Sequence, residues 1–348
     1  MNFASDNWAG AHPDIAASLA EHSTGHVPAY GASSLDAKVE ERLCEIFERK
    51  VAVYFVATGT AANSLSLAAV ARPGGVAFAH SESHMMDDEC GAPEFLAGGA
   101  RLCPVDGALG RIDPENLEAA IRRYPPEFIH AGQPMAASIT QATEVGTAYS
   151  LEQIAEIAEI CRNHSIPLHM DGARFANALM ALECSPAEMT WRAGIDAVSF
   201  GGTKNGLMGV EALVMFDAAK AWEFELRRKR GAHLFSKHRF LSAQMLAYLD
   251  DGLWLEMARA ANEANARLVA GLRGVGGVTF AHSPDANMTF ATWPRALHRQ
   301  LFDAGAQYHL WDGAVEGDDP DERLTARLVC DWSASDENTA RFLELLGG

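Results

Sequence analysis

The sequence predicts an α/β protein with a large domain built on a mostly parallel sheet and a small α+β C-terminal domain. Between residues 51 and 216, short apolar runs alternate with helical patterns, which is typical of a parallel sheet covered on both faces. A long helical stretch follows from about 217 to 272, and the tail alternates short strands with helices. The chain of 348 residues is also longer than one compact domain usually is.

The predicted elements follow in chain order. A short helix starts at Pro13, and a second has the apolar positions Val39, Leu43, Ile46 and Phe47. In the large domain we expect strands at 51–57, 75–79, 128–131, 166–170, 197–200 and 212–216. The helices between them are expected at 61–71, from Asp113-Pro114, from Ser150-x-x-Gln153 and at 173–182.

The tail is predicted to contain strands at 278–281, 288–291 and 324–330, with helices at 294–304 and 335–346. Glycines 231 and 252 interrupt the long helical stretch before it. The predicted division is an N-terminal arm over 1–25, a large cofactor-binding domain over 26–245 and a small C-terminal domain over 246–348.

Composition and charge exclude several classes of protein. The chain is 48% hydrophobic and 21% charged, as expected of a globular protein and not of a disordered one. A net charge of −18 argues against a general nucleic-acid binder. No run approaches the ~20 apolar residues of a membrane span, and no secretory signal is visible. Six cysteines without paired spacing predict reduced thiols and a cytoplasmic location.

Parallel sheets bind ligands at the carboxyl ends of their strands, so the loops after strands are candidate site segments. In the first, a strand runs through Thr58-Gly59-Thr60 directly into a helix. Free N–H groups, the helix dipole and the Thr60 hydroxyl favour an anion such as phosphate there. A helix cap with a tight turn would explain the same residues. The pattern is neither a GxGxxG nor a P-loop.

The next two loops carry a carboxylate and an amine. Asp171 ends a buried strand, where it needs a cation or several donors; a protonated ring nitrogen would suit it. The alternative is a helix N-cap. Lys204 lies between glycines after another strand, and desolvation there would favour the neutral amine, which can form a Schiff base. The alternative is a surface lysine in a turn.

The fourth loop, from His80 to Cys90, contains two histidines, acidic residues and a thiol, which could suggest zinc. No second His/Cys pair at metal spacing supports that interpretation, so we expect no metal. We expect His84 to lie beside a flat cofactor, with an ordinary loop histidine as the alternative. A phosphate cradle, a histidine, an aspartate and a lysine are together the parts that pyridoxal phosphate requires.

These segments resemble the threonine aldolase group of the beta-eliminating lyases, within the fold-type-I pyridoxal-phosphate enzymes. The matching motifs are Ala57-Thr-Gly-Thr-Ala-Ala-Asn63, His169-Met-Asp-Gly-Ala-Arg174 and Ser199-Phe-Gly-Gly-Thr-Lys-Asn-Gly206, and the resemblance covers nearly the whole chain. It implies a transferase-like large domain of fold type I. It also implies an aldehyde-lyase that cleaves L-threonine, L-allo-threonine and related β-hydroxy-α-amino acids such as phenylserine to glycine and an aldehyde.

The resemblance implies roles for the cofactor residues, position by position. Lys204 would form the Schiff base, Asp171 would pair with the ring nitrogen, and His84 would stack on the ring. Arg174 counts among the cofactor contacts as well as the substrate contacts. The phosphate would be held by Gly59 and Thr60, with Ser199 and Thr203 as further candidates.

The substrate carboxylate would be held by Ser5, Arg174 and Arg327, because an arginine fork pairs a carboxylate bidentately. Lys237 falls where the family often has a basic residue that reaches a neighbouring subunit's phosphate, which implies a homodimer or homotetramer. A solvated charge is the alternative for Lys237.

Two departures from the family pattern affect these roles. Many members have a histidine near the substrate hydroxyl in an Asn-Thr-His segment, whereas residues 139–146 here contain none. His84 or a water is therefore expected to take the hydroxyl proton. The Tyr-Gly-x-Asp pattern of many relatives ends in Ser33 here, so the role of that aspartate is not carried over. Another pyridoxal-phosphate lyase, an aminotransferase and, more distantly, a metal-dependent hydrolase are the rival functions.

Overall fold

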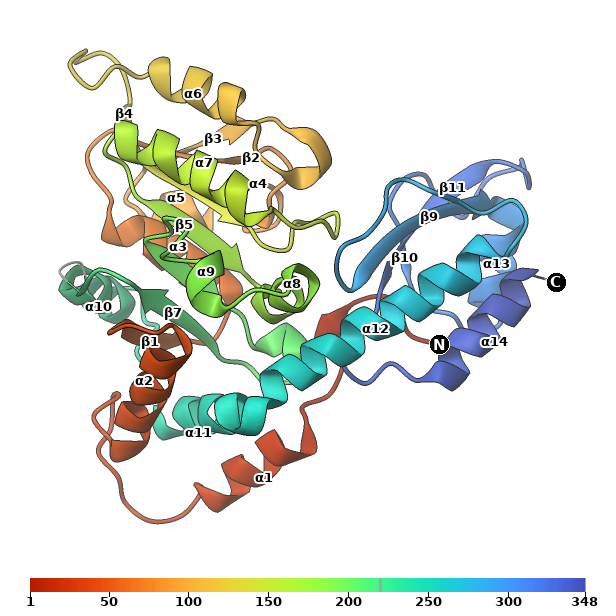
Figure 1. The fold of residues 1–348 in the computed structure, drawn as a ribbon, viewed down its shortest axis with the longest axis horizontal. Coiled ribbons are helices and arrows are strands. Elements are labelled where there is room, and N and C mark those ends of the chain that lie inside the picture. Colours follow the sequence, from red (N-terminus) through yellow and green to blue (C-terminus); the bar gives the residue numbers. More distant parts are fainter. Residues whose placement is uncertain (219–220, 348) are drawn as a thin grey trace.

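The computed structural model describes residues 1–218 and 221–347, and its main feature is a seven-stranded sheet in the order β1-β7-β6-β5-β4-β2-β3 (Figure 1). Strands β6, β5, β4, β2 and β3 run parallel, while β7 is antiparallel to both of its neighbours. The predicted mostly parallel sheet is confirmed. Its strands are β1 (Ala52–Val56), β2 (Gly75–His80), β3 (Arg101–Val105), β4 (Gln133–Thr140), β5 (Leu168–Gly172), β6 (Ala197–Phe200) and β7 (Glu211–Met215).

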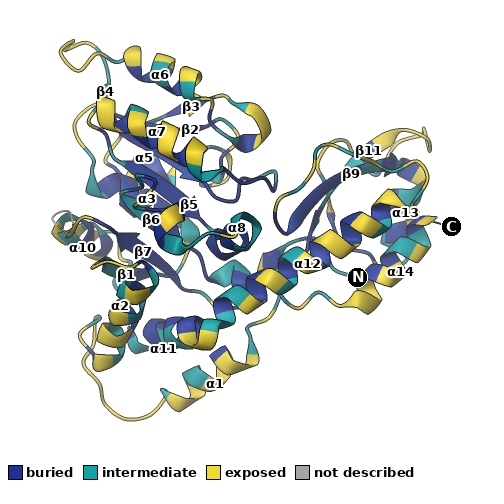
Figure 2. Ribbon diagram, viewed as in Figure 1, coloured by how far each residue is buried: buried dark blue, intermediate teal, exposed yellow. Residues whose placement is uncertain are grey.

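Helices cover both faces of this sheet. The main hydrophobic cluster joins the sheet to α2, α6, α7 and α8, and two further clusters join it to α3, α5 and α10. Figure 2 shows buried strands between helices whose outer faces are exposed. The helices are α1 (Pro13–Glu21), α2 (Ser34–Ile46), α3 (Gly59–Ala69), α4 (His84–Asp87), α5 (Ala92–Leu96), α6 (Pro114–Arg122), α7 (Leu151–Asn163), α8 (Phe175–Leu182), α9 (Pro186–Met189), α10 (Ala221–Arg230), α11 (Arg239–Leu249) and α12 (Leu253–Arg273).

Two predicted helix starts have the expected caps. Asp113 Oδ1 accepts hydrogen bonds from the N–H groups of Glu115 and Asn116, with proline at the first helical position of α6. Ser150 and Gln153 form a reciprocal capping box at the start of α7. Such caps satisfy N–H groups that have no partner within the helix, so they fix where each helix begins.

The C-terminal part contains a four-stranded antiparallel sheet in the order β10-β11-β9-β8. Its elements are β8 (Thr279–Phe280), β9 (Met288–Pro294), α13 (Arg295–Asp303), β10 (His309–Leu310), β11 (Arg323–Val329) and α14 (Asp336–Gly347). The predicted small α+β domain is confirmed.

Two segments tie the small sheet to the rest of the chain. Helix α12 runs from α11, beside the large sheet, to the small sheet (Figure 1). The chain start also lies at the small sheet, where Phe3 is buried and its N–H donates to the carbonyl of Gln307 at 2.7 Å. Helix α12 packs against α8 of the large part and against α14 of the small part, so it belongs to both. The exact division into 1–25, 26–245 and 246–348 therefore stays a prediction.

The prediction of a strand at 128–131 is wrong. That segment forms turns, and Phe128 and Ile129 are 54% and 89% exposed. The strand β4 starts only after Gly132, in a run of small residues with little strand pattern. Edge strand β3 was not predicted either, because Arg101 and Pro104 interrupt its apolar pattern.

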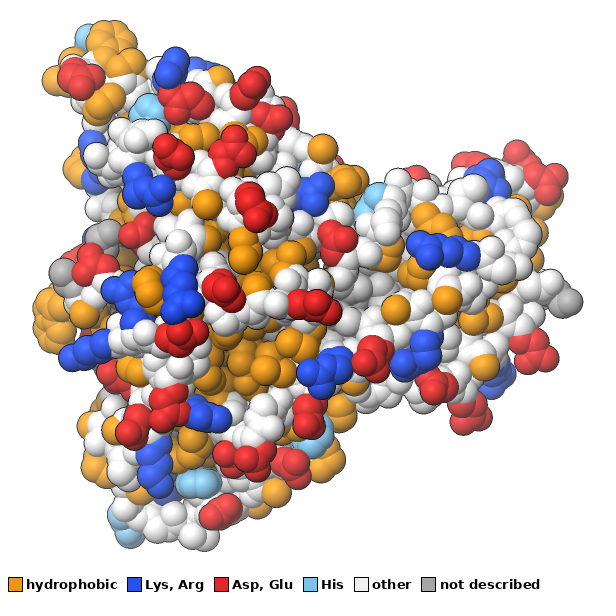
Figure 3. Space-filling view, in the orientation of Figure 1, with side chains coloured by type: hydrophobic (Ala, Val, Ile, Leu, Met, Phe, Trp, Pro, Cys, Tyr) orange, Lys and Arg blue, Asp and Glu red, His pale blue; other side chains and the backbone are white. Residues whose placement is uncertain are grey.

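The surface agrees with the acidic composition. On the face shown in Figure 3, basic side chains are interspersed with acidic ones and form no continuous basic area. Among the helices of the described residues, none is both long and apolar enough to span a bilayer.

Candidate active site

Loops at the carboxyl ends of β1, β2, β5 and β6 meet at one cavity of about 250 Å³. The cavity brings together the predicted residues Gly59, Thr60, His84, Asp171, Thr203 and Lys204. Asn7, Ala57, Thr58, Asn63, Ala173 and Glu211 also line it. The segments that the sequence singled out separately therefore share one site.

One end of the cavity is the start of helix α3. Thr58 caps this helix, because its Oγ1 accepts from the N–H of Ala61 at 3.1 Å and its carbonyl accepts from the N–H of Ala62. The N–H groups of Gly59 and Thr60 have no acceptor among the described residues. Two unpaired donors at the positive end of a helix dipole suit a phosphate group.

The other end of the cavity is Asp171, which is 4% exposed. Its Oδ1 accepts from the N–H of Ala173 at 3.0 Å and its Oδ2 from Asn63 Nδ2 at 2.9 Å. In the part of the chain that the structure describes, no lysine, arginine or histidine forms an ion pair with it. A buried carboxylate with neutral donors alone is costly, so the site fits a cationic ring nitrogen at this position.

Asp171 belongs to a chain of buried polar groups that the sequence did not reveal. Asn63 Nδ2 also donates to Glu89 Oε1 at 2.9 Å, and the same oxygen lies 3.0 Å from His84 Nδ1. The hydrogen bond to Glu89 raises the pKa of His84, which favours a cationic imidazole. The available signal was Asn63, an amide one helical turn after Gly59 in a helix whose other residues are glycine, alanine, leucine and hydroxyl residues.

The loop that carries Lys204 packs directly on the loop that carries Asp171. The N–H of Gly201 donates to the carbonyl of Gly172 at 3.0 Å, and a Cβ at Gly201 would lie 2.5 Å from the carbonyl oxygen of Ala173. Only glycine fits such an approach. The close packing of these two neighbouring strand ends therefore places Lys204 and Asp171 at one cavity.

Arg174 follows Ala173 of the cavity lining, and its charge acts on Arg327, but neither arginine is itself part of the lining. Arg174 is buried, and its Nε and Nη2 donate to the two carboxylate oxygens of Asp6 at 2.7 and 3.1 Å. Burial and the positive charge of Arg174 lower the pKa of Arg327, whose Nε donates to Met288 Sδ at 3.4 Å. A substrate carboxylate between two guanidinium groups would relieve their repulsion.

Asp6 was not predicted as a site residue. Burial alone would raise its pKa, but the charges of Arg174 and Lys204, together with hydrogen bonds from Arg174 and Asn287, lower the pKa of Asp6. The Asp6 carboxylate therefore holds Arg174 in place and balances part of the positive charge at the site.

The remaining predicted residues lie outside the cavity lining. Ser5 caps a short helix, with its Oγ accepting from the N–H of Asn7 at 3.1 Å. The Oγ of Ser199 lies 2.9 Å from His169 Nε2 beneath the site. Lys237 is exposed in a turn before α11. The contributions of Ser5, Ser199 and Lys237 to ligand binding stay predictions.

The buried His169 predicts a measurable loss of stability in acid. Its ring lies between Ser138 and Ser199, and burial lowers its pKa from 6.5 to about 4. Since the folded pKa is the lower one, the neutral ring stabilises the fold fully above the unfolded value, and this stability is lost as pH falls toward the folded value. We expect this residue alone to cost about 2 kcal/mol of unfolding free energy between about pH 7 and about pH 5. Urea unfolding of wild type and His169→Gln at both pH values measures it; equal pH slopes would contradict the assignment.

The Asp6–Arg174 pair predicts a large structural effect. Removing one partner of a buried ion pair leaves an uncompensated charge, so Asp6→Ala is expected to lower the unfolding free energy by about 3–5 kcal/mol. Glu48→Ala breaks the exposed Glu48–Arg192 pair and is the matched control, with an expected change below about 1 kcal/mol. Chemical denaturation of both variants checks this, and equal losses would refute the distinction.

Neither a metal centre nor the cavity beside α12 offers comparable chemistry among the described residues. Across residues 1–218 and 221–347, no three His, Cys, Asp or Glu side chains are placed to hold a metal ion. Both ring nitrogens of His80 already have backbone partners, the carbonyl of Gly107 and the N–H of Glu82.

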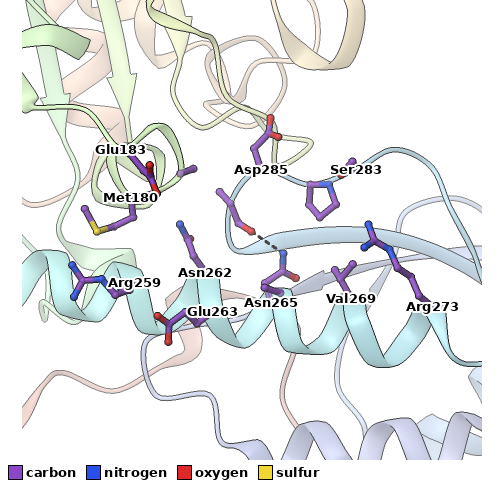
Figure 4. A pocket seen from close by; sticks show the side chains of 14 residues that line it. Met180, Glu183, Arg259, Asn262, Glu263, Asn265, Val269, Arg273, Ser283 and Asp285 are labelled. Carbon is purple, nitrogen blue, oxygen red and sulfur yellow. Dashed lines mark hydrogen bonds between the residues drawn. The ribbon is translucent and has the colours of Figure 1, made fainter.

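Figure 4 shows another cavity, of about 520 Å³, between α8, α12 and the loop 283–286. Its amides Asn262 and Asn265 are hydrogen-bonded within the protein, and no lysine, histidine or cysteine lines it.

Comparisons with known proteins show which family this chain resembles. A sequence model of the family described as beta-eliminating lyase matches residues 2–294. A low specificity L-threonine aldolase of Pseudomonas aeruginosa is 38% identical over 100% of this chain and 98% of its own length. A second enzyme with that name, from a Pseudomonas species, is 36% identical over 99% of this chain and 96% of its own.

A solved structure shares the fold over the full length. The threonine aldolase of Leishmania major superimposes with a TM-score of 0.91 at 26% identity, covering 99% of this chain and 98% of that one. The predicted α/β fold with a pyridoxal-phosphate-type large domain is thereby confirmed.

Proposed function

We propose that this chain, which belongs to the beta-eliminating lyase family, cleaves L-threonine, L-allo-threonine and related β-hydroxy-α-amino acids such as phenylserine to glycine and an aldehyde. It is a pyridoxal-phosphate-dependent lyase. The observation that carries the proposal is the cavity where Lys204 and Asp171 meet the open start of helix α3. An amine, an anion site and a buried carboxylate without a cation are what this cofactor needs.

The cofactor residues divide into three contacts. The N–H groups of Gly59 and Thr60 would hold the phosphate, Asp171 would keep the ring nitrogen protonated, and Lys204 Nζ would carry the covalent bond. His84, whose pKa is raised by its hydrogen bond to Glu89, would lie beside the ring. When bound, pyridoxal phosphate supplies an electron sink for the pair released from the Cα–Cβ bond.

The substrate residues act by orientation and proton movement. Arg174 and Arg327, with Ser5, would bind the carboxylate and so fix the direction of the Cα–Cβ bond; orientation of this kind contributes several kcal/mol to catalysis, up to about 7–11. Asp6 holds Arg174 for this task. Lys204 Nζ would also hold the proton that is delivered to Cα.

A product assay tests the proposed reaction. The protein supplied with pyridoxal phosphate is incubated separately with L-threonine, L-allo-threonine and phenylserine, and glycine, aldehyde, keto acid and ammonia are measured. Equal amounts of glycine and aldehyde are expected. Keto acid and ammonia instead would identify a β-elimination, and no product from any of the three would refute the aldolase proposal.

The proposal includes a cytoplasmic homodimer or homotetramer. All six cysteines are free in the described chain, which suits a reducing compartment. Tyr30 and Phe235, both exposed, lie on two segments joined by the hydrogen bond from the Tyr30 N–H to the Ser236 carbonyl at 3.1 Å. Exposed aromatic side chains next to Lys237 suit an interface with a second copy.

Mixing two defective variants tests whether Lys237 reaches a neighbouring subunit's site. Lys204→Ala and Lys237→Ala are unfolded together and refolded, so that hybrid dimers form. If Lys237 acts across the interface, each hybrid has one intact site and the mixture is more active than either variant alone. A mixture no more active than the average of its parts would contradict the shared site.

A further inference from the structure

The tight turn after β4 holds Glu144 rigidly. The N–H of Thr143 donates to the carbonyl of Thr147 at 2.8 Å, and the N–H of Gly146 donates to the carbonyl of Thr143 at 2.9 Å. Gly146 has a φ of 76°, and a Cβ there would lie 2.7 Å from the carbonyl oxygen of Met288. The turn conformation is therefore fixed by its hydrogen bonds and by its packing on β9.

This turn joins the two ends of the proposed site. On one side, the N–H of Gln141 donates to the carbonyl of Asp171 at 2.8 Å. On the other, Gly146 packs on Met288, and Met288 Sδ accepts from Arg327 Nε at 3.4 Å. Glu144 thus lies in the segment between the carboxylate assigned to the ring nitrogen and an arginine assigned to the substrate.

The charge of Glu144 reaches the cations of the site. It acts on the pKa of His84, of Arg174 and of Arg327, which belong to three different parts of the fold. Glu144 is half-buried, yet it accepts no hydrogen bond and forms no ion pair with any residue in 1–218 or 221–347. By contrast, the carboxylate of Asp6 is paired with Arg174, and that of Glu89 is hydrogen-bonded to His84 and Asn63. The structure leaves the Glu144 carboxylate available to a ligand.

We propose that Glu144 is the base that takes the proton from the β-hydroxyl of the substrate. This inference rests on the proposed function. The O–H bond breaks and its proton goes to the Glu144 carboxylate, while the oxygen's electron pair forms the aldehyde C=O. Bound pyridoxal phosphate would accept the electron pair of the breaking Cα–Cβ bond, and a proton added at Cα would give glycine. One proton leaves and one returns, so the reaction is balanced.

His84 is less suited to this step. Its Nδ1 is engaged by Glu89 at 3.0 Å, and that hydrogen bond raises the pKa of His84. Only Nε2 of His84 is therefore open to a ligand, whereas neither oxygen of the Glu144 carboxylate has a hydrogen-bond partner among the described residues. In this assignment His84, which lines the cavity, lies beside the cofactor ring, and Glu144 accepts the proton.

Charged and titratable groups from several elements surround the turn. They are His84 from α4, Arg174 after β5, Arg327 from β11, Arg111 before α6, and His282 and Asp285 from the loop before β9. The proposed base therefore faces cations on three elements and one carboxylate, Asp285, across the turn.

Two reactions of one variant test the proposal. Glu144→Gln should lower kcat for L-threonine cleavage by about 10²–10⁴-fold, with KM little changed, and should lose the fall in rate that the wild type shows toward low pH. Exchange of the glycine α-proton in D₂O, followed by NMR, needs the cofactor, Lys204 and the arginines but no β-hydroxyl. The exchange should therefore stay at the wild-type rate.

A rescue variant and a control complete the test. Glu144→His should recover part of the cleavage, and its fall in rate toward low pH should begin at a higher pH than in the wild type. Glu115→Gln, an exposed glutamate on α6, is the matched control.

Other outcomes would overturn the assignment. Unchanged cleavage in Glu144→Gln would exclude Glu144 as the base. A parallel loss of cleavage and glycine exchange would show that Glu144 acts on the arginines or the cofactor and not on the hydroxyl proton. If the wild type neither cleaves L-threonine nor exchanges glycine, the proposed function fails, and the role of Glu144 fails with it.

Discussion

Lys204→Ala is expected to lose both the covalent bond to pyridoxal phosphate and nearly all aldol cleavage. Lys204 is the lysine of the cavity that also contains Asp171 and the start of α3. Loss of its amine removes the covalent attachment and the proton donor to Cα, and a single positioned proton-transfer group typically contributes about 10²–10⁴-fold. The rate should therefore fall by at least that factor. The purified wild type should be yellow with bound cofactor, and the variant should lose the absorbance of the lysine-bound form.

Lys38→Ala is the matched control, because Lys38 is an exposed lysine on α2 outside the cavity. It should keep both the colour and the rate. Wild-type absorbance and activity in Lys204→Ala would remove the basis of the proposed site.

Asp171→Asn is expected to keep the cofactor bound to Lys204 but to cleave the substrate far more slowly. The substitution keeps the size of the side chain and removes the charge that would face the ring nitrogen. Breaking a buried charge pair costs about 3–5 kcal/mol, and a cost of that size in the transition state alone lowers the rate by hundreds- to thousands-fold. The measurement is kcat for L-threonine together with the absorbance of the bound cofactor.

Asp303→Asn, at an exposed carboxylate at the end of α13, is the control and should cleave at the wild-type rate. A wild-type rate in Asp171→Asn would show that the carboxylate does not support the reacting ring.

The sequence predicted those parts of the site that follow directly from strands. Thr58 to Thr60, Asp171 and Lys204 each come after a short apolar run, and parallel strands bring their carboxyl ends to one edge of the sheet. Local pattern therefore sufficed to place them together. The same reasoning failed for β4, where a run of small residues gave no strand signal and an exposed Phe-Ile pair gave a false one.

Interactions between distant segments could not be predicted in this way. Asp6 and Arg174 lie 168 positions apart and meet only because the N-terminal segment returns to the sheet edge. The contacts from Asn63 and from His84 to Glu89 depend on how α3 packs against the loop after β2. Glu144 has no local sequence pattern that marks it, and its significance comes from the charges around it.

Reduction of the holoenzyme with borohydride, followed by peptide mass mapping, tests the assignment of Lys204 most directly. Reduction makes the bond between cofactor and lysine permanent, so the modified residue can be read from its mass. We expect the added cofactor mass on the peptide that contains Lys204, and its disappearance when L-threonine is present before reduction. A label on another lysine such as Lys237, or bound cofactor with no labelled peptide, would contradict the account.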